Sequence, residues 1–217
     1  MGQKINSPCW YSSFGIRDFF LILHLPFTSV VICYVVLGNL MSGYLFFDRL
    51  ILSIVTVFCF LEGTHFLDEV NDRPWETNLS NKMIYLIASL FIVLGFFTGT
   101  YLSAVVSWKL FPLVITGTVF PPLYGLEFFN ELFHNLYFFS ITWGGLPYLG
   151  GYLVQEPKLG LVSLMISFAV SINSGIIYIL YQNTKKTETK TLAWRVLKLQ
   201  ILFWNIWVIS LLLNEII

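Results

Sequence analysis

The chain has 217 residues, of which 57% are hydrophobic, 18% aromatic and only 11% charged. Soluble domains carry about 25% charged residues, so this composition excludes a water-soluble globular protein. The 12 basic and 12 acidic side chains give a formal net charge of zero, which excludes the basic surface that a nucleic-acid-binding protein needs.

The sequence contains seven apolar runs, most of them about as long as a membrane-spanning helix. A hydrocarbon core of roughly 30 Å takes about 20 residues of helix, and runs without apolar–polar alternation favour helices over a β-barrel. In chain order the runs are Phe19–Gly43, Leu50–Phe66, Met83–Ala104, Leu110–Leu126, Leu136–Val154, Leu159–Gln182 and Leu199–Leu213. The sequence therefore predicts an all-α, polytopic transmembrane bundle of about seven helices, forming a single integral membrane domain over residues 1–217.

The basic residues are distributed unequally between the loops. If successive loops alternate sides, three basic residues fall on one side, namely Arg49, Lys109 and Lys158. Nine fall on the other side: Lys4, Arg17, Arg73, Lys82, Lys185, Lys186, Lys190, Arg195 and Lys198. Cytoplasmic loops carry an excess of Lys and Arg. This asymmetry predicts a cell-membrane protein with its N-terminus in the cytoplasm and its C-terminus outside.

Seven of the twelve carboxylates fall in two short segments, 62–76 and 127–134, and each segment also contains a histidine. The loop alternation places both segments at the cytoplasmic ends of their helices. At 100° per residue, an arc of about 120° in the first segment holds Glu62, His65, Asp68, Glu69 and Asp72. In the second segment an arc of about 100° holds Glu127, Asn130, Glu131 and His134.

Carboxylates in a membrane helix cost about 2.5–3.5 kcal/mol each, so they normally face a cavity or a partner. A divalent cation or a proton would relieve the repulsion between them. The predicted metal ligands are His65, Asp68, Glu69, Asp72, Glu127, Glu131 and His134. Among these, Glu69 and Glu127 are expected to be the oxygen ligands, with Asp68 and Asp72 toward the cavity mouth. The alternative is a solvated interfacial turn, and His24 is expected to be an interfacial or core histidine.

The first acidic segment resembles a signature of the UbiA superfamily of intramembrane prenyltransferases. That family carries Asn-Asp-x-x-Asp-x-x-x-Asp at the cytoplasmic end of its second helix; here Thr64-His65 stand for Asn-Asp, while Asp68 and Asp72 keep the spacing. Residues 143–152 are similar to the family's small-residue helix, and 191–195 to its Thr-Leu-Ala-x-Arg. Around Asn173, where the family has a second aspartate motif, this sequence keeps the asparagine and has no aspartate.

The resemblance implies a UbiA-like fold and a metal-dependent transferase acting on an isoprenoid or other membrane lipid. In the family, Mg²⁺ ions held by the aspartates bind the prenyl diphosphate, so Mg²⁺ is the first expectation here. Asp68, Asp72 and Glu69 are the expected catalytic residues. The expected substrate-binding residues are Arg73, Lys82 and Asn173, the first two through direct contacts of their cationic side chains with phosphate.

Two other interpretations stay open. Glu62/His65 and Glu131/His134 are both Glu-x-x-His pairs, which helical bundles use to bind two iron or manganese ions. Imidazole with carboxylate suits Fe, Mn or Zn better than Mg²⁺, and such a site would oxidise or hydrolyse a lipid. The remaining interpretation is a non-catalytic membrane subunit that conducts protons or contacts a partner, within an oligomer or beside a partner subunit.

The fifth apolar run, Leu136–Val154, contains four glycines: Gly144, Gly145, Gly150 and Gly151. Glycines permit close approach of helices, or a broken helix beside a pocket. The pattern predicts a cavity beside this helix that opens to the cytoplasm and continues into the apolar bundle.

Overall fold

The computed structural model describes residues 17–71, 77, 79–127, 129, 132–186 and 188–216, and all their regular elements are helices. In chain order these are α1 (Arg17–Ile22), α2 (Leu25–Leu40), α3 (Phe47–Asn71), α4 (Asn81–Val105), a 3-10 turn (Trp108–Leu110), α5 (Phe111–Gly125), α6 (Leu136–Ser140), a π-helical segment (Ile141–Gly145), α7 (Leu146–Gln155), α8 (Leu161–Thr184) and α9 (Lys190–Ile216). The predicted all-α class is therefore confirmed for these residues.

Four of the described helices, α3, α4, α8 and α9, are long and apolar enough to cross a membrane. Helix α2 is apolar but shorter. The outer faces of α4, α8 and α9 expose large apolar side chains such as Phe97, Phe168 and Phe203, which in water would form an unfavourable surface. These features are those of a membrane protein.

The first apolar run is not one continuous helix. It divides into α1 and α2, with Leu23 and His24 between them. Pro26 lies in the first turn of α2. A proline is tolerated there because its missing N–H would have no partner within the helix, but its ring clashes with a preceding helical turn, so α1 and α2 do not form one helix. His24 adopts a left-handed backbone conformation with φ 45°, so the break also turns this side chain.

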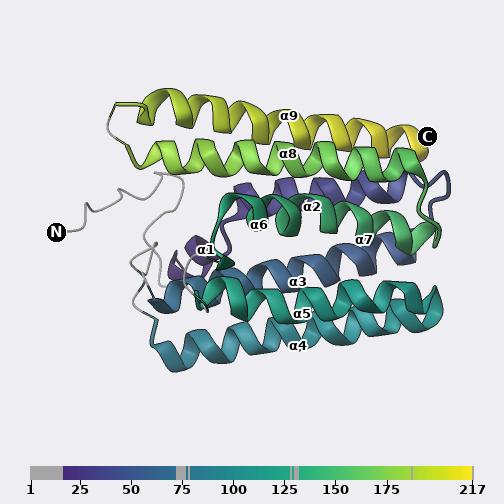
Figure 1. The fold of residues 1–217 in the computed structure, drawn as a ribbon, viewed down its shortest axis with the longest axis horizontal. Helices are drawn as coiled ribbons and strands as arrows, with labels where there is room; N and C mark the ends of the chain where they lie inside the picture. The colour runs from purple at the N-terminus through teal and green to yellow at the C-terminus, as the bar shows by residue number, and fades with distance from the viewer. Residues whose placement is uncertain are drawn as a thin grey trace.

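The helices lie with their axes roughly parallel and alternate in direction (Figure 1). One end of the bundle, hereafter the site end, carries the last residues of α3, α5 and α8 and the first residues of α4, α6 and α9. Of the predicted group of nine basic residues, seven are described: Arg17, Lys82, Lys185, Lys186, Lys190, Arg195 and Lys198. Arg17 lies in α1, and the other six lie in the first turn of α4, just after α8 or in the first third of α9, which are at the site end. The other three basic residues lie at the start of α3, in the 3-10 turn and between α7 and α8, toward the opposite end.

Helices α2 and α7 pack together through two glycines. A Cβ atom on Gly38 would collide with the carbonyl oxygen of Tyr148, and one on Gly151 would collide with that of Val35. The two backbones can therefore approach closely, as is usual where small residues meet between membrane helices. This contact anchors the continuous helix formed by α6, the π-helical segment and α7 in the middle of the bundle.

Candidate metal centre and adjoining cavities

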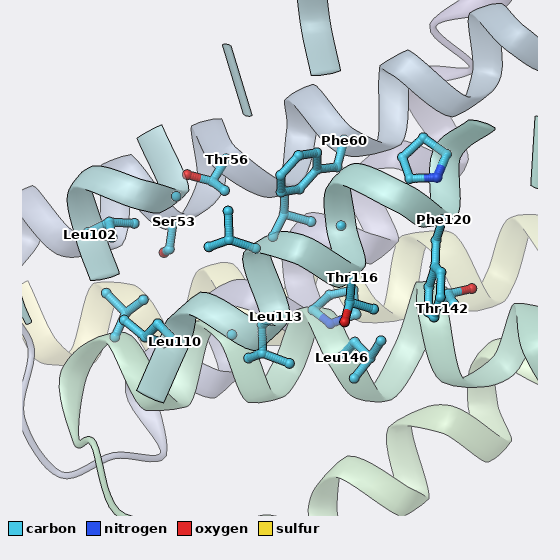
Figure 2. Close-up of a pocket in the computed structure, with 18 of the residues that line it drawn as sticks. Ser53, Thr56, Phe60, Leu102, Leu110, Leu113, Thr116, Phe120, Thr142 and Leu146 are labelled. Carbon is cyan, nitrogen blue, oxygen red and sulfur yellow. The ribbon is translucent and has the colours of Figure 1, made fainter. Parts of the chain in front are cut away.

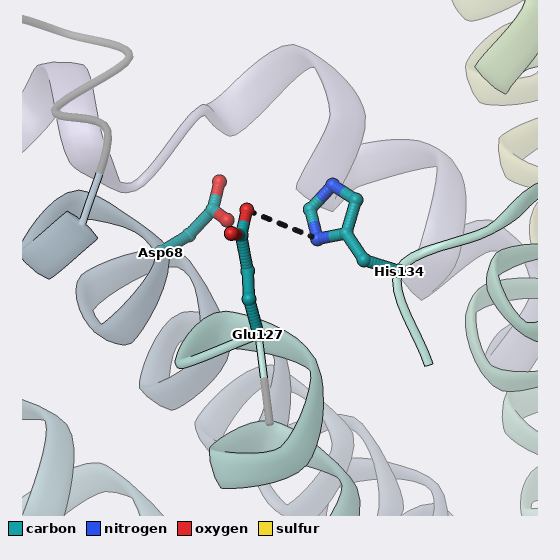
Figure 3. A group of neighbouring side chains, drawn as sticks. All are labelled: Asp68, Glu127 and His134. Atoms are coloured by element: carbon teal, nitrogen blue, oxygen red, sulfur yellow. Dashed lines mark ion pairs between the residues drawn. The ribbon is translucent and has the colours of Figure 1, made fainter. Parts of the chain in front are cut away.

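Three side chains from the two acidic segments meet at the site end. Asp68 lies near the end of α3, Glu127 lies just after α5, and His134 precedes α6. One ligand atom from each lies within 4.8 Å of those of the other two. The Oε1 atom of Glu127 is 3.8 Å from Nδ1 of His134, as Figure 3 shows. The predicted convergence of the two segments is therefore found for these three residues, hereafter the metal triad.

The second acidic segment is a turn, and the expectation of a helical face there is wrong for its described residues. Helix α5 ends at Gly125, which packs so tightly on α3 that a Cβ would lie 2.7 Å from the Cβ of Leu67. The chain then takes positive φ angles at Glu127 (52°) and Phe129 (65°), which interrupt helical geometry. Asn135 starts the next helix by accepting a hydrogen bond from the N–H of Phe138 at 3.0 Å.

Strained backbone conformations concentrate at this end of the molecule. The non-glycine residues with positive φ among those described are His24, Glu127 and Phe129. Such conformations cost of the order of 1–3 kcal/mol and tend to cluster at functional sites. Two of these three residues carry side chains of the metal triad or of the cavity beside it.

A cavity of about 120 Å³ adjoins the metal triad. All three histidines of the chain line it, although the sequence interpretation gave His24 no functional role. The lining consists of His24, Phe27, Val31, Leu61, Thr64, His65, Asp68, Tyr124, His134, Phe139, Trp143, Tyr178, Tyr181, Gln182 and Lys185. We call this space the polar cavity.

The metal triad has the donor atoms of a metal site. Nδ1 of His134 is buried and forms no hydrogen bond with the described residues, and its 3.8 Å separation from Glu127 is too long for one. Two carboxylates this close repel each other unless a proton or a cation lies between them. One nitrogen and two oxygen donors suit Zn²⁺, Mn²⁺ or Fe²⁺ and leave coordination positions for a ligand.

The other predicted metal ligands are in different places. His65 lines the polar cavity but is not part of the metal triad. Glu69 is fully buried, and its Oε1 accepts hydrogen bonds from the backbone N–H (3.0 Å) and hydroxyl (2.7 Å) of Thr77. Asp72 and Glu131 lie outside the described residues.

The predicted substrate contacts are also not part of the described cavity lining. Lys82 is exposed at the start of α4. Asn173 donates a hydrogen bond of 2.7 Å to the hydroxyl of Tyr34, and Arg73 lies outside the described residues. The cationic group in the lining is Lys185, whose Nζ is 5.1 Å from the ring centroid of Tyr181.

Helix α8 contributes a polar stripe that the sequence interpretation missed. Tyr178, Tyr181, Gln182 and Lys185 all line the polar cavity. Their spacing of i, i+3, i+4 and i+7 is that of one helical face, so the pattern was available in the sequence.

A second cavity, of about 100 Å³, lies among α3, α4, α5 and the continuous α6–α7 helix (Figure 2). Its walls are mostly apolar, with Phe60, Leu113 and Phe120 among them. Trp143, in the π-helical segment, lines both this apolar cavity and the polar cavity. Gly150 borders the apolar cavity, and a Cβ added there meets no atom within 4 Å.

The chain was compared with protein-family models, with curated proteins and with solved structures, and none of them matches it. The UbiA resemblance therefore depends on the sequence motifs alone.

Proposed function

We propose that this protein is an integral membrane metalloenzyme, related to the UbiA prenyltransferases, that acts on an isoprenoid or other lipid substrate. The observation that carries the proposal is the convergence of Asp68, Glu127 and His134 within 4.8 Å, beside a polar cavity. A membrane bundle rarely keeps carboxylates and imidazoles around a cavity unless they serve a ligand or a transported ion.

We propose further that the chain crosses the membrane seven times, with the site end in the cytoplasm. Each of the seven apolar runs contains helical structure, and the helices alternate in direction. The site end also carries most of the basic residues, as cytoplasmic ends do. This orientation puts the N-terminus in the cytoplasm and the C-terminus outside.

Asp68, Glu127 and His134 would hold the cation, with Asp72 an additional candidate from the sequence. A bound divalent cation supplies charge neutralisation for a leaving diphosphate. Mg²⁺ fits the two carboxylates together with substrate phosphate oxygens, whereas the imidazole favours Mn²⁺, Fe²⁺ or Zn²⁺. Lys185 places a positive charge in the same cavity and can contact phosphate as a point charge.

The apolar cavity would accommodate the hydrocarbon part of the substrate. Trp143 lines both this cavity and the polar cavity, and we propose that a single amphiphile with a polar head and a long apolar chain occupies both. The aromatic rings around the polar cavity present π faces that can stabilise an allylic cation.

The test is metal content together with release of diphosphate. Purified protein in nanodiscs should contain about one divalent cation per chain by elemental analysis, and Asp68→Asn and His134→Ala should each lose it. Glu156→Gln, at the end of α7 opposite the metal triad, is the control and should keep the metal. With geranylgeranyl diphosphate as the probe, metal-dependent release of diphosphate supports the proposal. Equal metal content in wild type and both triad variants would contradict it.

A second candidate function is favoured by one observation, the nitrogen ligand in the metal triad. Imidazole with carboxylates is a donor set of iron, manganese and zinc enzymes, which would oxidise or hydrolyse a lipid. Bound Fe, Mn or Zn without diphosphate release from the prenyl probe would favour this candidate. Absence of both metal and lipid binding would instead indicate a non-catalytic membrane subunit.

A further inference from the structure

Glu62 is a carboxylate buried in the middle of the bundle, about one and a half turns before Asp68 on α3. Its side chain is 0% exposed. One oxygen, Oε1, lies 2.8 Å from the hydroxyl of Thr28 on α2, whose single proton is shared between this carboxylate and the backbone carbonyl of Leu23, also at 2.8 Å. The other, Oε2, lies 3.4 Å from Nδ1 of His65. Burial of a carboxylate costs free energy, so the groups that contact Glu62 indicate its role.

The partner that reaches the cavity is His65. Its side chain is 20% exposed and lines the polar cavity. Because Nδ1 faces Glu62, Nε2 is the ring nitrogen left for the cavity. The ring of His24 lies against the same imidazole, with 5.9 Å between the ring centroids, so the imidazole is restrained from a second direction.

His65 is not a member of the metal triad. The described residues whose ligand atoms come together within 4.8 Å are Asp68, Glu127 and His134, and they do not include His65. A carboxylate that fixes one imidazole nitrogen, so that the other faces a ligand, is the arrangement by which enzymes orient a general base. The 3.4 Å separation is long, as is common for catalytic pairs without a ligand.

We propose that His65 is the proton-transfer residue of this cavity, and that Glu62 and Thr28 are its positioning residues; this rests on the proposed function. The substrate class is a lipid diphosphate together with an acceptor that bears an O–H group, either an alcohol, a phenol or water. The acceptor oxygen forms the new bond to the lipid carbon, and the carbon–oxygen bond to diphosphate breaks with its electron pair leaving on the diphosphate. The acceptor proton passes to Nε2 of His65, while the proton on Nδ1 stays directed at Glu62.

The chain has only three histidines, so each can be followed individually in ¹⁵N-histidine-labelled protein. In wild type, long-range ¹H–¹⁵N NMR should find His65 protonated on Nδ1 and bare on Nε2. Diethyl pyrocarbonate, a reagent for neutral imidazole nitrogens, should modify His65, with the site identified by mass spectrometry. In Glu62→Gln, the single tautomer should be lost and the modification rate at His65 should fall, because Nε2 then carries the proton in part of the molecules.

A second variant and a matched control keep the test decisive. Thr28→Val keeps the carboxylate but removes its hydroxyl donor, so it should change His65 in the same direction by a smaller factor. Ser29→Ala, next in sequence, removes the hydrogen bond from Asn205 of α9 to Ser29 and should leave the tautomer and the modification rate of His65 unchanged. If Glu62→Gln does not fold, the result for Thr28→Val decides whether the assignment of His65 is correct.

Metal content separates failure of this inference from failure of the proposed function. The inference requires that His65→Gln keep the metal that His134→Ala loses. Loss of metal in His65→Gln, or an unchanged tautomer and modification rate in the Glu62 and Thr28 variants, would overturn the assignment of His65. A wild type that contains no metal would contradict the proposed function, while the histidine measurements would remain interpretable.

Discussion

Two of the polar clusters among the described residues lie toward opposite ends of the bundle, and they differ in chemistry. At the end opposite the site end, the amide of Asn39 donates to Ser53 (3.1 Å), and Gln155 donates to Asn39 (2.7 Å) and to the carbonyl of Phe46 (3.0 Å). The carbonyl oxygen of the Gln155 side chain in turn accepts from the N–H of Phe46 at 3.0 Å. These groups are neutral, and their polar atoms find partners within the chain.

The cluster at the site end is charged and incompletely paired. Two carboxylates and an imidazole of the metal triad come together, and Nδ1 of His134 forms no hydrogen bond with the described residues. A fully bonded neutral network holds helices together and needs nothing else. A charged cluster that faces a cavity needs a cation or a ligand. The two clusters therefore differ in whether their polar atoms are satisfied by other groups of the chain.

The largest effect should come from metal binding. Mn²⁺ added at 100 times its Kd should stabilise the protein by about 2.7 kcal/mol, and a chelator should reverse this. Glu127→Gln should remove the stabilisation, whereas Gln155→Leu should keep it because that residue belongs to the other cluster. The measurement is the thermal midpoint with and without Mn²⁺ in nanodiscs. An equal Mn²⁺ effect in both variants would mean that the two clusters do not differ in metal binding.

A change in the neutral network should lower the stability of the protein and leave its metal binding intact. Gln155→Leu leaves the side-chain oxygen of Asn39 and the N–H and carbonyl of Phe46 without their partner. Buried polar groups left unpaired cost about 1–3 kcal/mol, so unfolding should become easier by about 2 kcal/mol. Denaturation in mixed micelles measures this change. Asn183→Ala, which loses an exposed hydrogen bond to the carbonyl of Ile179 near the end of α8, is the control and should change stability by less than about 0.5 kcal/mol. An unaltered stability of Gln155→Leu would mean that the network is not structural.

The two cavities allow a test of whether the polar head and the apolar chain of a ligand bind at different places. Gly150→Phe places a ring in the apolar cavity without a backbone clash, because a Cβ there meets no atom within 4 Å. Binding of geranylgeranyl diphosphate should weaken about tenfold, or about 1.4 kcal/mol, while inorganic diphosphate should bind as before. Gly160→Phe is the matched control, because a Cβ at Gly160 is equally unobstructed and lies outside both cavity linings. Equal weakening in the two variants would show that the apolar cavity does not hold the chain.

Much of the fold follows from patterns that local physics explains. Apolar run length located the helical regions, and Pro26 marks the point where the first run divides. Alternation of successive loops was enough to bring Asp68 and His134 to one end. The path of the chain after Gly125 could not be predicted from the periodicity of the sequence, because the positive φ angle at Glu127 interrupts helical geometry.

The direction of individual side chains depended on distant partners. His24 reaches the polar cavity because of the turn before α2 and the packing against His65. Asp68 and Glu69 are neighbours in sequence, and helical geometry alone separates them by about 100°. That angle does not say which of them faces the cavity. The N–H and the hydroxyl of Thr77 both donate hydrogen bonds to Glu69, and Asp68 is the residue of the two that lines the cavity.

The smallest expected effect tests this difference between Asp68 and Glu69 directly. Glu69→Gln replaces charge-assisted hydrogen bonds to Thr77 with weaker neutral ones, so stability should fall by about 1 kcal/mol. The stabilisation by Mn²⁺ should remain, because Glu69 is directed at the segment that follows α3. Asp68→Asn, one residue earlier, should show the opposite pattern: loss of the Mn²⁺ effect and, in metal-free protein, no loss of stability, since repulsion from Glu127 is relieved. If Glu69→Gln abolished the Mn²⁺ effect, Glu69 would be a metal ligand, as the sequence interpretation expected, and the assignment of a structural role to it would be wrong.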